Sequence, residues 1–236
     1  AGYAAVLIPL KSNNRAPGDL RSEEMDALAA LADQFSQGFI RVAHSQDLVF
    51  PAVVETELPA LYAALKTLGL NYPLGGLLGD MVSCLGGDYC SLANARSIPI
   101  AQDIAEGYAD LDSQESIGPL DLRISGCMNS CGHHHIGHLG ILGVDKDGAA
   151  FYQVLLGGHS GHGAPAALGT VIGKAFAEDE IVDAVEEILE HYLEARTPGE
   201  TFRETVSRVG KEAFAKAADR ARRTASHDRD HEGAQS

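Results

Sequence analysis

Hydrophobic positions in the first seventy residues follow two spacings: strict alternation, and recurrence every three or four residues. Alternation is typical of a half-buried strand, and the longer period is typical of an amphipathic helix. Thr56 is placed to cap the second helix, while Gly38 and Gly69 are placed to end the two helices. The pattern predicts a strand at 3–10, a helix from Ser22, strands at 39–43 and 48–53, and a helix from Thr56. This β-α-β-β-α order describes a compact two-layer α+β unit.

The rest of the chain follows a turn-rich linker at 71–80 and has a mixed pattern as well. It predicts a short helix at 98–110, a strand at 120–125, a hairpin of 136–145 with 149–158, and helices at 178–195 and 200–223. The polar tail is expected to be disordered. We therefore predict an α+β protein with two domains, 1–75 and 76–223, and a disordered tail at 224–236.

Charge narrows the possible partners of the chain. Its 236 residues carry a formal net charge of −15, and such an acidic surface repels nucleic-acid phosphates and anionic lipids. No apolar run is long enough to cross a membrane. The opening AGYAAVLIPL has no basic residue and contains Pro9, so we expect a strand there and not a signal peptide. The first residue is Ala1, and we expect the chain to be part of a longer protein.

Four cysteines form two pairs, in the segments SCLGGDYC and GCMNSCG. Cys84 and Cys90 are separated by five residues, and Cys127 and Cys131 by three. Paired cysteines in a cytoplasmic chain are more often metal ligands than disulfides, and we expect a cytoplasmic location. Four thiolates can hold an iron–sulfur cluster, and neighbouring glycines let backbone N–H groups approach the sulfides. Structural zinc and four unrelated buried cysteines are the alternatives, although zinc ligand pairs are usually two to four residues apart.

These segments resemble a known family. SCLGGDYCSLA followed by GCMNSCGHHHIGHLGILG is similar to the sirohaem and 4Fe–4S signature of nitrite and sulfite reductases, including Asn129 and Gly132. The resemblance covers most of the chain: residues 1–70 resemble the family's ferredoxin-like half-domain, and 80–195 its sirohaem domain. One pseudo-repeat of the family fold is expected. Within the family, these segments are most similar to those of bacterial assimilatory sulfite reductase haemoproteins.

The resemblance implies specific roles for these residues. Each cysteine would bind one cluster iron, and Cys131 would also bridge to the sirohaem iron. Asn129 and Gly132 would be cofactor-binding residues as well. Sulfite would be reduced to sulfide, or nitrite to ammonia in the alternative enzyme. A non-catalytic electron-transfer or sirohaem-binding module is the third hypothesis. Expected partners are the missing N-terminal half of the same protein, which would supply most catalytic residues, and a ferredoxin or flavoprotein electron donor.

Arg41 is the internal candidate for a sirohaem contact. Its segment FIRVAHSQDL resembles the family's R-L-T-x-x-Q-N segment at Arg41 and Gln46, but Ala43 and Asp47 depart from it. An exposed strand arginine is the alternative. The glycine-rich segment 157–169 is expected either to offer backbone N–H groups to sirohaem carboxylates or to be a plain loop.

Two further groups of side chains are open to more than one interpretation. A histidine tract can bind metal, but the resemblance accounts for this one without a second site. Its members are His133, His134, His135 and His138, with His159 and His162 later in the chain. The last predicted helix carries the only basic run, which is either a solvated face or a docking surface for an acidic electron donor. Its members are Arg203, Arg208, Lys211, Lys216, Arg220, Arg222 and Arg223.

Overall fold

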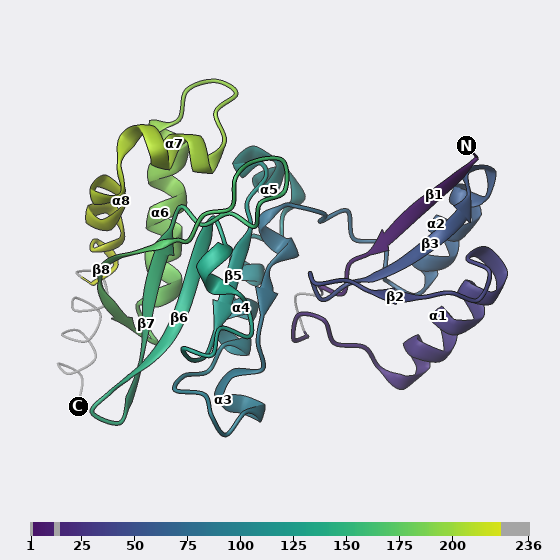
Figure 1. Cartoon of the computed structure of the whole chain (residues 1–236), viewed down its shortest axis with the longest axis horizontal. Helices are drawn as coiled ribbons and strands as arrows, with labels where there is room; N and C mark the ends of the chain where they lie inside the picture. The colour runs from purple at the N-terminus through teal and green to yellow at the C-terminus, as the bar shows by residue number, and fades with distance from the viewer. Residues whose placement is uncertain (1, 12–14, 223–236) are drawn as a thin grey trace, which may run out of the picture. The chain divides into compact units, whose positions relative to one another are not determined.

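The computed structural model describes residues 2–11 and 15–222, which divide into two compact units. The first unit ends at Gly75 and the second begins at Gly76. Each unit has a hydrophobic core of its own. Figure 1 shows the helices and strands of both units.

The first unit is a three-stranded antiparallel sheet with two helices. Its elements are β1 (Tyr3–Ile8), α1 (Ser22–Phe35), β2 (Arg41–Val42), β3 (Leu48–Val54), a 3-10 helix (Glu55–Glu57) and α2 (Leu58–Thr67). The strand order is β1-β3-β2, so β3 pairs with both neighbours. Leu28 of α1, Leu61 of α2 and Phe50 of β3 are each at most 1% exposed and share one core. The predicted β-α-β-β-α order is confirmed.

Two details of the first unit differ from the prediction. The strand expected at 39–43 is only two residues long, because Phe39 and Ile40 lie outside the ladder with β3. Thr56 does not cap α2, since it lies within the 3-10 helix and Glu57 occupies the cap position without a side-chain hydrogen bond.

The second unit is a five-stranded mixed sheet in the order β4-β5-β6-β7-β8. Its strands are β4 (Val82–Ser83), β5 (Leu122–Ser125), β6 (Leu139–Lys146), β7 (Ala149–Leu156) and β8 (Thr170–Ala177). Strands β4, β5 and β6 are parallel, whereas β6, β7 and β8 are antiparallel. The sheet is accompanied by α3 (Gly86–Tyr89), α4 (Ile98–Gly107), α5 (Leu111–Ile117), α6 (Ile181–Ala195), α7 (Phe202–Val209) and α8 (Lys211–Ala218).

The predicted hairpin and the long amphipathic helix are confirmed. Asp147 and Gly148 both have positive φ, 55° and 84°, as a two-residue hairpin turn requires. Lys146 consequently pairs with Ala149, and the ladder continues to Leu139 and Leu156. Helix α6 buries residues that recur at helical spacing, among them Ile181, Val185, Ile188, Leu189 and Tyr192.

Several features of the second unit differ from the prediction or are absent from it. The helix expected at 200–223 is interrupted at Gly210, whose φ of 93° is incompatible with a continuous helix. The helix expected at 98–110 ends at Gly107, and α5 follows it unpredicted. Strands β4 and β8 were not predicted either. Arg223 and the tail at 224–236 lie outside the described residues.

Candidate metal centre

The two cysteine pairs lie in loops that follow neighbouring parallel strands. Cys84 comes directly after β4, and Cys127 follows β5 by two positions. The backbone N–H of Cys84 donates to the carbonyl of Ile124 at 3.1 Å, which extends the β4–β5 pairing into the first loop. Because the carboxyl ends of parallel strands meet at one sheet edge, both pairs lie at the same edge.

Direct contacts join the first loop to the second. The N–H of Gly126 donates to the Sγ atom of Cys84 at 3.1 Å. The carbonyl of Gly126 accepts from the N–H groups of Asn94 and Ala95 at 2.8 and 3.0 Å. A Cβ atom on Gly126 would lie 2.6 Å from the Ala95 carbonyl oxygen and 2.8 Å from the Gly86 Cα atom. The two loops are therefore packed backbone to backbone, with no space for a side chain between them.

The second loop is tightly turned around its two cysteines. Ser130 has a φ of 58°, and its N–H donates to the carbonyl of Cys127 at 3.2 Å. The N–H of Gly132 donates to the Ser125 hydroxyl at 3.1 Å. A Cβ atom at Gly132 would lie only 1.9 Å from the carbonyl oxygen of Ile124, so this position admits only glycine.

The donor set suits an iron–sulfur cluster. All four cysteines are free thiols, and one of them, Cys84, already accepts a backbone N–H of the kind that stabilises a thiolate ligand. Within the ranges 2–11 and 15–222, no three His, Cys, Asp or Glu side chains converge on one point as ligands of a single ion. The cysteines of a 4Fe–4S cube bind separate irons, so its ligands do not need to converge in that way.

Large apolar side chains project from the same two loops. Leu85, Tyr89 and Leu92 are 58, 78 and 69% exposed, and Met128 is 79% exposed. Exposed apolar groups gathered in this way mark a surface that something else covers. The two loops therefore present exposed apolar side chains beside the cysteines.

The histidine tract is largely occupied by structural contacts. The Ser130 hydroxyl lies 3.2 Å from Nδ1 of His134 and 3.0 Å from Nδ1 of His135, and the two rings pack at 3.9 Å. Burial, with a smaller contribution from His135, lowers the pKa of His134 to about 4. His138 accepts the Asp121 N–H at Nδ1 and stacks on His159. His133 is exposed, so these side chains do not act as one metal-binding group.

The remaining predicted site residues lie in different surroundings. Asn129 is exposed between the two cysteines of the second loop. Arg41 is an exposed residue of β2 opposite Val49, in the first unit, and its predicted sirohaem contact stays a prediction. In the glycine-rich segment, His159 and Ala167 form an isolated bridge that closes a loop before β8.

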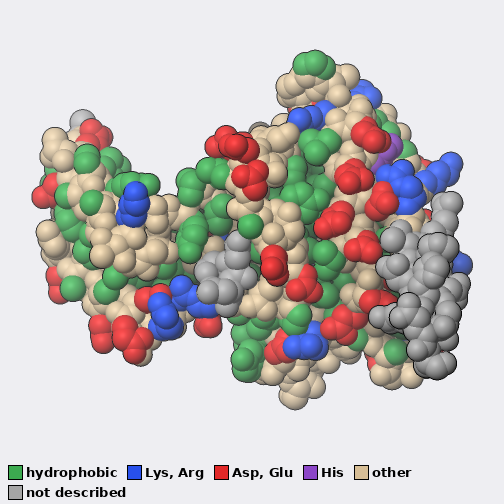
Figure 2. Space-filling model, turned by 180° about the vertical axis from the view of Figure 1, so that it is seen from behind, with side chains coloured by type: hydrophobic (Ala, Val, Ile, Leu, Met, Phe, Trp, Pro, Cys, Tyr) green, Lys and Arg blue, Asp and Glu red, His purple; other side chains and the backbone are tan. Residues whose placement is uncertain are grey.

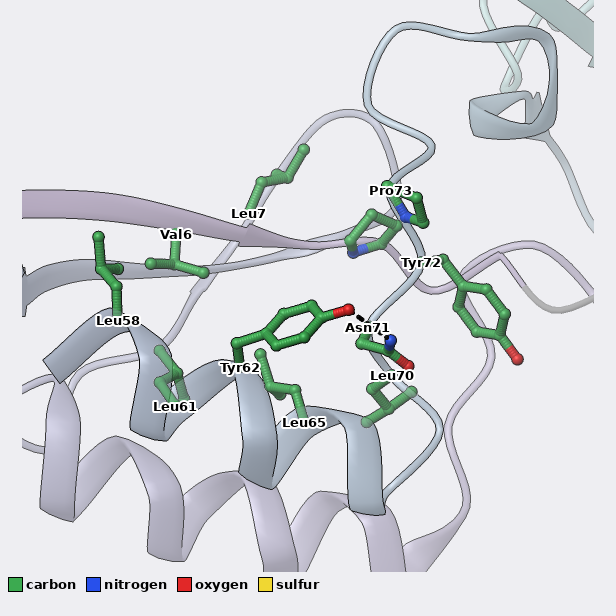
Figure 3. Close-up of a pocket in the computed structure, with 11 residues that line it drawn as sticks. Val6, Leu7, Leu58, Leu61, Tyr62, Leu65, Leu70, Asn71, Tyr72 and Pro73 are labelled. Atoms are coloured by element: carbon green, nitrogen blue, oxygen red, sulfur yellow. Dashed lines mark hydrogen bonds between the residues drawn. The ribbon is translucent and has the colours of Figure 1, made fainter. Parts of the chain in front are cut away.

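Sequence reasoning missed an apolar pocket of about 320 Å³ in the first unit. It lies between β1 and α2, with Leu61, Leu65 and Tyr62 on its helical side (Figure 3). The only hydrogen bond drawn within it joins the Tyr62 hydroxyl to Asn71 Nδ2 at 3.3 Å. No periodic signal in the sequence could have revealed this pocket, because the 71–73 segment that closes it is irregular.

Comparison with known families identifies the second unit. The sequence model described as "Nitrite and sulphite reductase 4Fe-4S domain" matches residues 90–224, more than half of the chain. The chain belongs to the nitrite and sulphite reductase family. A second model, the nitrite/sulfite reductase ferredoxin-like half domain, matches residues 10–68. The predicted family and fold class are confirmed, and the 4Fe–4S cluster expected at the cysteines is the one that the family description names.

Relatives in this family include both kinds of reductase. The chain is 31% identical to a ferredoxin–nitrite reductase of Synechococcus elongatus over 73% of its own length and 34% of that protein. It is 28% identical to a sulfite reductase [NADPH] hemoprotein beta-component of Nitrobacter hamburgensis over 79% of its length and 32% of that protein. The chain thus spans about a third of the length of these relatives.

Solved structures agree with this assignment. The NirA protein of Mycobacterium tuberculosis superposes with a TM-score of 0.66 at 27% identity, over 89% of this chain and 39% of that one. A dissimilatory sulfite reductase I superposes with a TM-score of 0.71 at 14% identity, over 92% of this chain and 69% of that one, and shows the fold alone. Among the described residues, no helix is both long and apolar enough to span a bilayer.

Proposed function

We propose that this chain is the cluster-bearing part of a sulfite reductase, which converts sulfite to sulfide with six electrons at a sirohaem coupled to a 4Fe–4S cluster. The observation that carries the proposal is the contact of Gly126 N–H with Cys84 Sγ, because it joins both cysteine loops into one ligand set. The membership of the chain in a family of sulfite and nitrite reductases supports it.

In this proposal, Cys84, Cys90, Cys127 and Cys131 each hold one iron of the cluster. When bound, the cluster and sirohaem would relay six electrons from the electron donor to sulfite, and protons taken up with these electrons would let the three oxygens leave as water. Cys127 is buried and Cys131 is exposed, which suits Cys131 for an additional contact with the sirohaem iron. The Gly126 N–H stabilises negative charge on the Cys84 sulfur, and Asn129 and Gly132 shape the loop that presents Cys131.

Nitrite reduction to ammonia is the second candidate function. The 31% identity to a ferredoxin–nitrite reductase favours it. For either substrate, we infer that a ferredoxin or a flavoprotein subunit delivers the electrons and that the rest of a longer protein supplies further cationic groups. We also infer a cytoplasmic location, where reducing conditions keep four cysteines available as ligands.

The cluster assignment is tested by substituting each cysteine with serine. The wild-type chain, expressed anaerobically with sirohaem supply, should contain iron and acid-labile sulfide and show a sirohaem absorption band. Because each substitution removes one of four ligands, iron and sulfide in each variant should fall below about half of the wild-type content. Ser91→Ala is the matched control, since Ser91 is exposed beside Cys90 in the same loop. Wild-type protein that contains zinc and no sulfide would disprove the assignment.

The substrate assignment is tested by turnover. The full-length protein that contains this chain should consume sulfite faster than nitrite with reduced methyl viologen as the electron donor. A preference for nitrite would favour the second candidate. If neither substrate is consumed although cluster and sirohaem are present, the chain would be an electron-transfer or sirohaem-binding module.

A further inference from the structure

The basic run near the end of the chain separates into paired and unpaired cations. Arg208 is paired with Glu200, Arg220 with Glu187, and Arg222 with Glu180 and Asp219. Within the described ranges, Arg203 has no hydrogen-bond or ion-pair partner, although it is half-buried at the start of α7. Among the residues that the structure describes, Lys211 donates only to the neutral hydroxyl of Thr170, at 2.7 Å.

Arg203 and Lys211, neither of which forms an ion pair with a carboxylate among the described residues, line one pocket. This pocket has a volume of about 450 Å³ and lies where α7, α8 and the end of β7 meet. Arg203 and Ser207 are four residues apart in α7 and therefore share a helix face. Lys211 follows the turn at Gly210, and Val206 and Gly157 complete the wall.

Glycine at position 157 keeps the pocket open beneath the Lys211 side chain. A Cβ atom there would lie 3.2 Å from Lys211 Cε and 3.4 Å from Lys211 Nζ. The φ of Gly157 is 84°, a conformation that other residues rarely adopt. The Lys211 side chain therefore lies close to the backbone at the end of β7, and its ammonium group donates to Thr170, the first residue of β8.

The local electrostatics favour an anion in this pocket. The two cations outnumber the one acidic residue among its lining residues, Glu204, whose negative charge interacts with Arg203 and whose carboxylate also accepts from the Thr201 N–H and hydroxyl at 2.9 and 2.7 Å. Helix α8 begins at Lys211 without a side-chain cap, so its positive end also faces this region. In a chain with a net charge of −15, two such cations in one pocket require an explanation other than general surface charge.

We propose that this pocket binds a tetrahedral oxyanion, a phosphate or sulfate group, through Arg203, Lys211 and Ser207. A guanidinium, an ammonium and a hydroxyl from two differently directed helices can reach separate oxygens of such a group. The volume leaves space for a small molecule that carries the oxyanion. The pocket is formed by other residues than the four cysteines, so the proposal holds whichever substrate the enzyme reduces.

The test is calorimetric titration of the whole chain with inorganic phosphate, inorganic sulfate and adenosine 5′-monophosphate at constant ionic strength. Saturable binding of at least one of these three ligands is expected. Arg203→Gln and Lys211→Gln should each raise the Kd of the ligand that binds about tenfold, because each substitution removes a charge-assisted hydrogen bond. Ser207→Ala leaves both charges in place and should raise the Kd about threefold.

Lys216→Gln is the matched control, because Lys216 is an exposed cation of α8 outside the pocket. Binding of phosphate or sulfate alone would identify the free ion as the ligand, and much tighter binding of the nucleotide would identify a phosphorylated metabolite. The proposal is overturned if no probe binds, if Arg203→Gln leaves the Kd unchanged, or if Lys216→Gln weakens binding as much as Lys211→Gln.

Discussion

The glycines beside the cysteines are needed for backbone packing as well as for the N–H groups that the sequence predicts. The spacing predicts that they bring N–H groups to cluster sulfides, and Gly126 does donate to a cysteine sulfur. Their absent side chains matter as much, since Gly132 faces the Ile124 carbonyl and Gly126 faces Gly86 and Ala95. These contacts join segments far apart in sequence, so no local pattern could have predicted them.

Replacing Gly132 with alanine should therefore destabilise the second cysteine loop. The new Cβ atom would lie 1.9 Å from a backbone oxygen, and displacing that backbone should cost about 2–3 kcal/mol of unfolding free energy. Urea denaturation of both proteins measures the difference. Gly75→Ala makes the same chemical change where the nearest atom is 4.0 Å away, and it should be nearly neutral. Equal stabilities for the two variants would contradict the packing argument.

His134 should make stability depend on pH. Burial lowers its pKa to about 4, below the ordinary value of 6.5, so the unfolded chain binds a proton in a range where the folded chain does not. The stability that the neutral His134 contributes is fully present above pH 6.5, and it is lost as the pH falls toward about 4.

Urea denaturation at pH 7 and pH 5.5 tests this dependence. His134→Gln should reduce the loss of stability between the two pH values, because glutamine does not titrate. His133→Gln should retain the wild-type loss, since His133 is exposed. A wild-type protein equally stable at both values would refute the assignment.

At the scale of elements, prediction succeeded where the local signal was strong and repeated. Helix α6 places apolar residues on one face for fifteen positions, and its range was predicted to within a few residues. Strand β8 was missed because Gly173 and Lys174 interrupt its alternation, and Gly173 adopts a φ of 58°. Gly210 was overlooked within a helical pattern, although a single glycine in a left-handed conformation suffices to separate α7 from α8.

Two threonines offer a test of helix capping. Thr201 caps α7, accepting the Glu204 N–H while the Glu204 carboxylate binds the Thr201 N–H in return. Thr201→Ala should lower the free energy of unfolding by about 1 kcal/mol. Thr56→Ala should be nearly neutral, because Thr56 is exposed and caps no helix. Denaturation midpoints measure both changes, and a larger loss for Thr56→Ala would contradict the assigned caps.

For the whole molecule, acidic charge is unevenly distributed. Figure 2 shows acidic side chains gathered on one face of the second unit. Helix α6 alone carries Asp183, Glu186, Glu187, Glu190 and Glu194. Burial and the neighbouring carboxylates, Asp183 first among them, raise the pKa of Glu186 above its usual value. The charge of Glu186 is thus less favourable in the folded chain than in the unfolded one.

Glu186→Gln should accordingly raise the melting temperature at pH 7. A carboxyl whose pKa is raised on folding opposes folding when ionised, and this opposition is relieved as the pH falls through the raised pKa. The gain should therefore shrink at acidic pH. Glu115→Gln, which removes an exposed charge on α5, should have little effect at either pH. Differential scanning calorimetry at two pH values distinguishes the variants, and a lower melting temperature for Glu186→Gln would reject the argument.

The pairing of β4 with β5 also determines when the first cysteine loop can acquire its shape during protein synthesis. Cys84 depends on the N–H of Gly126, which lies 42 positions later in the chain. Until Gly126 has been synthesised and β5 has paired with β4, the first cysteine loop lacks the backbone N–H that supports the Cys84 sulfur. The set of four cysteines is therefore complete only after the chain has been synthesised through Cys131, and the first pair is not supported before the pairing of β4 with β5 has formed.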